Sequence, residues 1–108
     1  MARDPGLEEL IRADLPPESF TEKAMFGGWA WLLDGNLVCG ARDGSLLVRL
    51  GKGGDAWALA LPGIAPMISQ GRELSGWVRA GPQAYGDDAL RARLLSAALA
   101  FVRTLPGK

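Results

Sequence analysis

Residues 28–50, GWAWLLDGNLVCGARDGSLLVRL, consist of three apolar runs separated by two Asp-Gly pairs. Asp34-Gly35 and Asp43-Gly44 each have the length of a tight hairpin loop. Asp-Gly favours such loops because both residues tolerate a positive φ. The stretch therefore predicts a meander of three antiparallel strands, at residues 28–33, 36–41 and 45–50.

The alternation of side chains assigns every residue of these strands to one face of the sheet, provided that both loops contain two residues. One face is wholly apolar and is predicted to be the core, with Ala30, Leu32, Leu37, Cys39, Ala41, Leu46, Val48 and Leu50. The opposite face is predicted to carry Trp29, Trp31, Val38, Leu47 and Arg49.

Tryptophan and arginine dominate the energetics of protein interfaces, so those last five residues form the candidate interaction face, open to a partner or to a second copy. Replacing Trp31 with glutamate would then abolish association and leave the fold intact. Two alternatives stay open. The tryptophans fill the core of a small domain, or a single β-bulge inverts part of the register.

Helical patterns lie on both sides of the meander. Asp4 caps the first predicted helix and Asp87 caps the last and longest one. Between the meander and the last helix, the sequence predicts a short helix at residues 56–61 and two extended segments at residues 65–69 and 75–80. The order helix, three strands, helix, two strands, helix predicts an α+β domain in two layers, with the helices on one face of an antiparallel sheet.

The composition is that of one small folded domain, predicted to span residues 1–108. The 12 basic residues balance 12 acidic ones, which argues against strong binding to nucleic acid, because such binding depends on neutralising phosphates. The chain has no histidine and one cysteine, so it lacks the commonest metal ligand and any internal disulfide. No apolar run approaches the roughly 20 residues that span a bilayer, and residues 1–9 contain no signal-peptide core. A cytoplasmic location without membrane association is expected.

Candidate chemical motifs are few, and each has a simpler structural explanation. Residues 51–54, GKGG, lack the upstream glycine and the hydroxyl of a phosphate-binding loop. Asp87-Asp88 is better explained as a helix cap than as a pair of catalytic carboxylates, since adjacent helical side chains diverge. Cys39 falls on the predicted core face, where a thiol is inert. We therefore expect no catalytic residue, no metal site and no cofactor.

Phe26-Gly27-Gly28 stands at the entrance to the first strand of the meander. Consecutive glycines there predict either a positive φ or the close approach of another backbone segment, neither of which a β-carbon tolerates without strain. A bulky substitution at the glycine with positive φ is expected to cost more than about 1 kcal/mol.

Several local patterns, taken together, point to one family. Residues 23–28, KAMFGG, precede the meander, Gly71-Arg72 and Gly76-Trp77 follow it, and residues 104–108, TLPGK, close the sequence. In combination they resemble the N-terminal domain of TfoX (Sxy)-type proteins, regulators of natural competence genes in bacteria. The candidate structural or functional residues of this resemblance are Lys23, Met25, Phe26, Gly27, Gly28, Gly71, Arg72, Gly76 and Trp77.

The resemblance implies an α-β(3)-α-β(2)-α fold, also seen in secretion-chaperone-like proteins. It further implies a bacterial cytoplasmic protein without catalytic residues or cofactors. Competence regulators of this type carry a second, C-terminal helical domain, whereas this sequence ends at Lys108. The sequence therefore resembles the short relatives of the family that consist of the first domain alone.

The leading hypothesis is a non-enzymatic regulatory module that acts through protein–protein contacts, with a partner protein or with itself as a homodimer. One alternative is a transcriptional regulator that contacts DNA directly, which would require several of Arg42, Arg49, Arg72 and Arg79 to gather on one surface. Because the net charge is zero, direct binding to nucleic acid is not expected. A second alternative is a small-ligand binder, which would require a deep apolar cavity with convergent polar groups.

Overall fold

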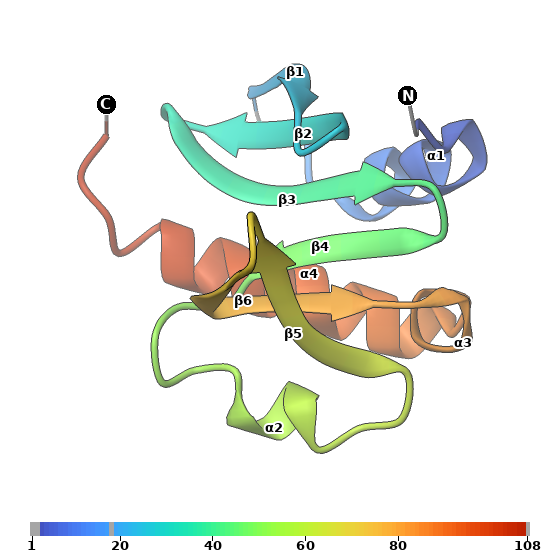
Figure 1. Ribbon diagram of the computed structural model, residues 1–108. Coiled ribbons are helices and arrows are strands. Elements are labelled where there is room, and N and C mark those ends of the chain that lie inside the picture. The colour runs from blue at the N-terminus through green and yellow to red at the C-terminus, as the bar shows by residue number, and fades with distance from the viewer. Residues whose placement is uncertain (1–2, 18, 108) are drawn as a thin grey trace.

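The computed structural model describes residues 3–17 and 19–107 and contains a six-stranded antiparallel sheet packed against helices (Figure 1). In chain order the elements are α1 (Pro5–Asp14), β1 (Phe20–Met25), β2 (Gly28–Leu33), β3 (Asn36–Arg42), β4 (Ser45–Arg49), α2 (Ala56–Leu59), β5 (Ile64–Ser69), β6 (Arg72–Ala80), α3 (Pro82–Tyr85) and α4 (Asp88–Val102). The strands lie in the order β1-β2-β3-β4-β6-β5. Helix α4 runs behind the sheet in the view of Figure 1.

The α+β class predicted from the sequence is confirmed, and the structure adds two elements to the predicted order. Residues 20–25, for which the sequence pattern predicted no strand, form β1, because they pair with β2 along their whole length. Helix α3 is a single turn that begins at Pro82, whose fixed φ suits the first position of a helix. The sheet thus has six strands where the sequence pattern indicated five.

The two aspartates predicted to cap the first and last helices do so. Asp4 Oδ1 accepts a hydrogen bond from Leu7 N at 3.1 Å, and Asp87 Oδ1 accepts one from Leu90 N at 3.0 Å. Asp55 makes no such bond at the start of α2, which is one turn long and ends earlier than predicted. Side-chain capping therefore supports the two helices that cover the sheet.

The main core lies between the sheet and helices α1 and α4. Helix α4 places an apolar stripe against the sheet, as its spacing predicts. The buried members of this core from α1, the central strands and α4 include Leu7, Ile11, Trp31, Val38, Cys39, Ala41, Leu46, Val48, Leu50, Leu94, Leu95, Ala98, Leu99 and Val102. The core positions predicted at Cys39, Ala41, Leu46, Val48 and Leu50 are confirmed.

A β-bulge between β2 and β3 reverses the predicted orientation of the two tryptophans. Asp34 and Gly35 have positive φ values of 52° and 80°, as a tight hairpin loop requires, and the pairs next to the loop follow the predicted register. The register then shifts, so that Trp31 pairs with Cys39 rather than with Val38. One extra residue in β3 reverses the alternation beyond it, and the tryptophans turn toward the helices.

The placement of Trp29, Trp31 and Val38 on an open face with Leu47 and Arg49 is therefore wrong. Trp31 is 1% exposed and Val38 is fully buried in the main core, while Trp29 is half-buried against it. A tryptophan removes about 200 Å² from water, worth about 5 kcal/mol at about 25 cal/mol per Å². This gain exceeds the contribution of about 1 kcal/mol of the one ladder hydrogen bond that a bulge gives up.

Three apolar residues lie outside the core that the sequence pattern assigned to them. Ala30, Leu32 and Leu37 occupy the opposite face of the sheet and are absent from the main core cluster. Ala30 and Leu32 are nevertheless buried, at 0% and 9% exposed. The second face of the sheet is thus partly covered by other parts of the chain.

Candidate functional site

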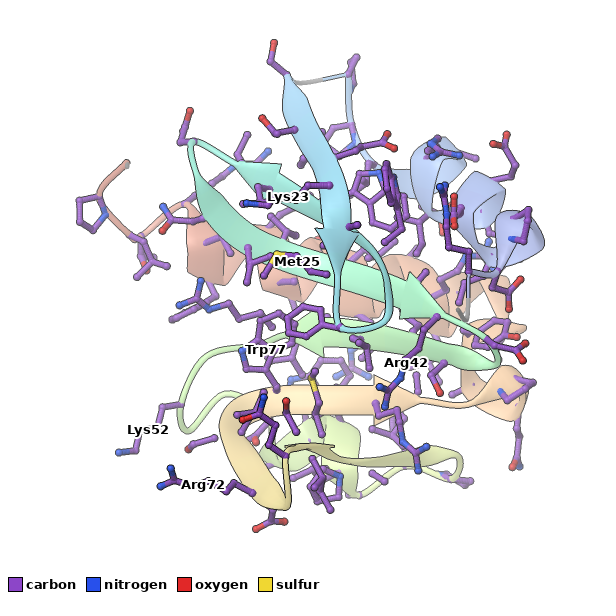
Figure 2. The ribbon with its side chains drawn as sticks, turned by 45° about the horizontal axis from the view of Figure 1, so that its top comes forward. Lys23, Met25, Arg42, Lys52, Arg72 and Trp77 are labelled. Carbon is purple, nitrogen blue, oxygen red and sulfur yellow. The ribbon has the colours of Figure 1, made fainter. Side chains whose placement is uncertain are left out.

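The sheet face opposite α1 and α4 is called the outer face, and it combines strands that are distant in sequence. The alternation of the observed strand pairs places on it Lys23, Met25, Arg42, Leu47, Arg49, Trp77 and Arg79. Figure 2 shows Lys23, Met25, Arg42 and Trp77 over the sheet, on the side turned away from α4. Leu47 is fully buried on this face. The Arg49 guanidinium, in contrast to the prediction, extends to α4, where it lies 5.5 Å from the centroid of the Phe101 ring, and it donates to the Leu37 carbonyl oxygen at 3.3 Å.

The β1–β2 turn folds Phe26 over the centre of the outer face. The Phe26 ring meets the Trp77 ring edge-on, with the centroids 5.5 Å apart and the planes at 64°. Gly40 lies beneath this ring, and a β-carbon there would make ordinary contact with Phe26 Cδ2 at 3.5 Å but would lie only 3.2 Å from the Trp29 carbonyl oxygen of the neighbouring strand. Edge-to-face pairs contribute about 0.5–1.5 kcal/mol beyond burial. This aromatic pair therefore joins the β1–β2 hairpin to β6.

Gly27 and Gly28 have two different backbone roles. Gly27 has a φ of 71° and forms the turn together with Phe26, whose φ is 59°. A β-carbon on Gly28 would clash with the Ala41 carbonyl oxygen of the neighbouring strand. Positive φ and close approach, the two explanations offered for this pair, are both confirmed, one at each glycine.

Gly76 lets β6 cross the chain directly after β4. Its φ is 85°, and a β-carbon there would lie 2.6 Å from Gly51 C and from Lys52 N. Leu50 N and Gly51 N both donate to the Gly76 oxygen, at 2.7 and 3.1 Å. This crossing brings Lys52 beside the strand that carries Trp77.

The charged side chains that alternation places on the outer face of β1 to β4 and of residues 77–80 are all basic. Lys52 and Arg72 lie at the lower left border of this face in Figure 2. The name basic rim is used below for Lys23, Arg42, Lys52, Arg72 and Arg79. Across residues 3–17 and 19–107, no ion pair involves a member of the basic rim. Arg42 donates a long hydrogen bond of 3.5 Å to the Phe26 carbonyl oxygen.

On the helix side of the sheet, by contrast, a cluster of charges around Arg12 is ion-paired. Arg12 donates to Glu22 at 2.8 and 3.1 Å and to Glu9 at 2.8 Å, and Trp29 Nε1 also donates to Glu22 at 2.7 Å. The Arg12 hydrogen bond, assisted by that of Trp29, lowers the pKa of Glu22 to about 2. The Glu22 hydrogen bond in turn raises the pKa of Arg12.

A second ion pair ties α1 to α4 in the interior. Arg91 is 4% exposed and donates to Asp14 at 2.6 Å, to Asp88 at 2.9 Å and to the Tyr85 carbonyl at 2.8 Å. Burial alone would lower the pKa of Arg91, but the bonds to the two carboxylates keep it above its ordinary value. Desolvation of this guanidinium is thus offset by three accepting oxygens.

Side chains of the N-terminal segment cover the two tryptophans of the candidate interaction face. The Arg3 guanidinium lies 3.9 Å from the centroid of the Trp29 ring, and that of Arg12 lies 5.6 Å from Trp31. A cation over an indole is attracted to the negative face of the ring. These residues therefore belong to a closed, ion-paired region.

Two surface clefts accompany the two sides of the sheet. One, of about 410 Å³, includes Arg12, Phe20, Glu22 and Trp31 in its lining, and its two charged groups neutralise each other. The other, of about 300 Å³, is lined by Asp55, Leu59, Pro66, Glu73, Leu74, Ser75 and Trp77. The second is called the Trp77 groove, and it adjoins the aromatic pair through Trp77.

The chemically reactive candidates are held in structural positions. Cys39 is fully buried, and burial raises the pKa of its thiol, so the nucleophilic thiolate is disfavoured. Asp87 accepts a hydrogen bond from a backbone N–H at the start of α4, so its carboxylate serves as a helix cap. In the described part of the chain, no helix is both long and apolar enough to cross a membrane.

A family model for the TfoX N-terminal domain matches residues 13–102 of the 108-residue chain. The chain belongs to the TfoX N-terminal domain family. The matched region begins near the end of α1 and extends through α4. The TfoX N-terminal domain is a regulatory, non-catalytic family. A search of curated proteins and a search of solved structures each found no match.

In this TfoX N-terminal domain, the residues of the family resemblance come from two hairpins that meet. Lys23, Met25 and Phe26 belong to the β1–β2 hairpin, whereas Arg72 and Trp77 belong to β6. Phe26 and Trp77 are in contact, and the glycines of both patterns shape the turns and crossings that permit it.

Three members of the basic rim were not among the predicted site residues of the TfoX N-terminal domain. Arg42 and Arg79 could have been found from alternation, because each is adjacent to a core residue, Ala41 or Ala80. Lys52 carries no such signal. Its position depends on the crossing of β6 at Gly76, which is a tertiary contact.

Proposed function

We propose that this TfoX N-terminal domain is a non-enzymatic, cytoplasmic regulatory module that acts on competence-type gene expression by binding a protein partner through the outer face. One observation supports the proposal most directly. The side chains that distinguish the family pattern meet on the outer face, and none of them lines the cleft beside Arg12 and Glu22.

The residue types on the outer face support a protein partner. Aromatic residues, methionine and arginine are enriched in protein interfaces, and tryptophan and arginine are frequent hot spots. Met25, Phe26 and Trp77 are each only partly buried, so part of every one of these side chains is open to a partner. Ile68, at 57% exposed, adds a further apolar group on β5.

The regulatory role is tested in the bacterium that carries this chain. Deletion of the gene is expected to change the transcript levels of DNA-uptake genes, and the complete chain is expected to restore them. Trp77→Ala should fail to restore them because it removes one ring of the aromatic pair. Trp57→Ala is the matched control, since Trp57 is also half-buried but lies on α2 under the Arg93 guanidinium at 4.0 Å.

The protein contact is tested by a photo-reactive benzoylphenylalanine at position 23 or position 93. Both positions are exposed, but Lys23 is on the outer face and Arg93 is on α4. We expect a discrete protein adduct from position 23 and none from position 93. Equal adducts from both positions, or unchanged transcripts after deletion, would contradict the proposal.

A further inference from the structure

We infer that the partner of the outer face is an acidic protein segment with an apolar side chain, whose carboxylates lie along the basic rim while the apolar group packs against Trp77. This inference rests on the proposed function and specifies the chemistry of the partner. Its basis is an imbalance of charge between the two sides of a chain whose net charge is zero.

The imbalance arises because the ion-paired carboxylates lie on the helix side of the sheet. On the helix side, Glu8, Glu9 and Glu22 pair with Arg3 or Arg12, and Asp14 and Asp88 pair with Arg91. The cations of the basic rim have no such partners among the residues that the structure describes. Acidic side chains of another molecule would supply the missing complement, and complementary potentials favour both encounter and specificity.

The centre of the outer face favours an apolar group between those carboxylates. Trp77 is a member of the aromatic pair and also lines the Trp77 groove. The other apolar residues of the groove lining are Leu59, Pro66 and Leu74. The groove has a volume of about 300 Å³, enough for one large side chain rather than for a folded ligand. A segment that combines carboxylates with one aromatic or aliphatic residue fits this surface.

Arg42, Arg72 and Arg79 gather on this surface, as direct DNA binding would require, but neighbouring carboxylates disfavour a nucleic acid. Glu73 follows Arg72 directly in β6, and Asp55 and Glu73 both line the Trp77 groove. A phosphate backbone that reached Lys52 and Arg72 would pass these two carboxylates, whereas a peptide can place an uncharged residue there. Nucleic-acid affinity also depends on the number of phosphates neutralised, which such carboxylates reduce.

The inference is tested with defined probes and the complete chain. The probes are a fluorescein-labelled oligoglutamate with one central phenylalanine, the same peptide with alanine at the centre, and an oligothymidylate of equal charge. Fluorescence anisotropy gives the Kd of each at low salt and at about 0.15 M ionic strength, where exposed charges are strongly screened. We expect the phenylalanine peptide to bind tightest, and binding of both peptides to weaken with salt.

Two matched variants locate the acidic contact. Arg79→Glu on the outer face and Arg93→Glu on α4 change the net charge by the same amount. We expect Arg79→Glu to raise the Kd of the phenylalanine peptide about tenfold, because a like charge replaces a complementary one. Arg93→Glu should change it by less than about twofold. Circular dichroism must show that both variants are folded, and Lys23→Glu replaces Arg79→Glu if the latter is not.

The apolar contact is tested by Trp77→Ala. In the natural chain we expect the phenylalanine peptide to bind about tenfold tighter than the alanine peptide, and in Trp77→Ala this preference should disappear. The inference is overturned if neither peptide binds, if the oligothymidylate binds as tightly, or if Arg93→Glu weakens binding as much as Arg79→Glu. A dimer that light scattering detects and the peptide does not compete would also overturn it. If neither peptide binds but Trp77→Ala still fails to restore transcript levels, the inference of an acidic partner is contradicted while the proposed regulatory function is not.

Discussion

Both sides of the sheet carry large aromatic and basic side chains, but the two sides differ in how far these side chains are buried and ion-paired. On the helix side, Trp31 is 1% exposed, and Arg12 lies over its ring while pairing with Glu22. On the outer face, Trp77 stays half-buried, and the neighbouring cations have no carboxylate partners among the described residues. The helix side is therefore organised for stability, whereas the cations of the basic rim on the outer face add no ion pair to the fold among the described residues.

The comparison also explains why aromatic content is a weak guide to an interface. Four tryptophans lie in the chain, and each has an arginine nearby or an aromatic partner. The arginines over Trp29 and Trp31 come from the N-terminal segment, with Arg3 just before α1 and Arg12 within it. Only the elements that cover an indole decide whether it belongs to a core or to a surface.

The largest expected difference between the two sides concerns their tryptophans. Trp31→Ala should lower the free energy of unfolding by about 3–5 kcal/mol, because it removes a fully buried indole and leaves a cavity. Trp77→Ala should cost less than about half of that, since its indole is only partly buried. Urea unfolding followed by circular dichroism measures both. Trp31→Glu is expected to unfold the chain, in contrast to the intact fold predicted from an open face. Equal losses for the two alanine variants would remove the contrast.

A smaller effect is expected at the glycines that support the β1–β2 hairpin. Gly28→Ala should cost more than about 1–2 kcal/mol, because its β-carbon clashes with the Ala41 carbonyl oxygen and β2 or β3 must shift. Gly27→Ala meets no atom within 4 Å and should cost only about 1 kcal/mol, the penalty of a positive φ. Thermal unfolding of both variants ranks them. A larger loss for Gly27→Ala would show that φ, rather than crowding, governs the hairpin.

A pH effect of smaller size is expected on the helix side. The pKa of Glu22 is about 2 in the folded chain and 4.5 without its partners, so its contribution to stability is complete above about pH 4.5. That contribution should disappear as the pH falls toward 2. The Glu22 side chain is 32% exposed, so the contribution should stay below about 1 kcal/mol.

The measurement is urea unfolding between pH 6 and pH 2 for the natural chain, Glu22→Gln and the control Glu73→Gln. Glu22→Gln should be less stable near pH 6 and converge with the natural chain at the lowest pH. Glu73→Gln alters an exposed glutamate of β6 and should follow the natural chain throughout. Parallel curves for Glu22→Gln and the natural chain would show that the Arg12 contact adds no pH-dependent stability.

The smallest expected effect is on the outer face. Lys23→Ala and Arg79→Ala should each change the free energy of unfolding by less than about 0.5 kcal/mol, because exposed side chains without ion pairs contribute little to folding. The same urea titration measures both. A loss above about 1 kcal/mol for either variant would mean that its cation serves the fold, and the contrast between the two sides would weaken.

Local patterns predicted most of the elements but not the orientation of β2. The Asp34-Gly35 loop, the capping by Asp4 and Asp87 and the apolar stripe of α4 depend on neighbours within a few residues, so the sequence is sufficient for them. β1 was not predicted as a strand because its residues are mostly exposed and show no apolar alternation. It becomes a strand by pairing with β2. The orientation of β2 depended on a bulge that no local signal announced.

The candidate site divides in the same way. The family resemblance included Phe26 and Trp77, but sequence spacing gave no reason to expect their rings to touch. The candidate interaction face was built from parity alone, and one extra residue at Val38 was enough to redistribute it. Parity is a property carried along the whole strand, so a single irregularity changes every position beyond it.

By itself, the sequence determined the α+β class, the central meander, the capped helices and the family, because these follow from local conformational preferences and from apolar periodicity. Only the tertiary structure decided which face each tryptophan takes and which cations remain without partners. Helix α1 covers one side of the sheet and places Arg12 beside Glu22 of β1, and the resulting burial outweighs the hydrogen bond that the bulge gives up. The orientation of a strand depends on the summed free energies of contacts that are distant in sequence. The pattern of apolar residues within one strand carries no information about these contacts.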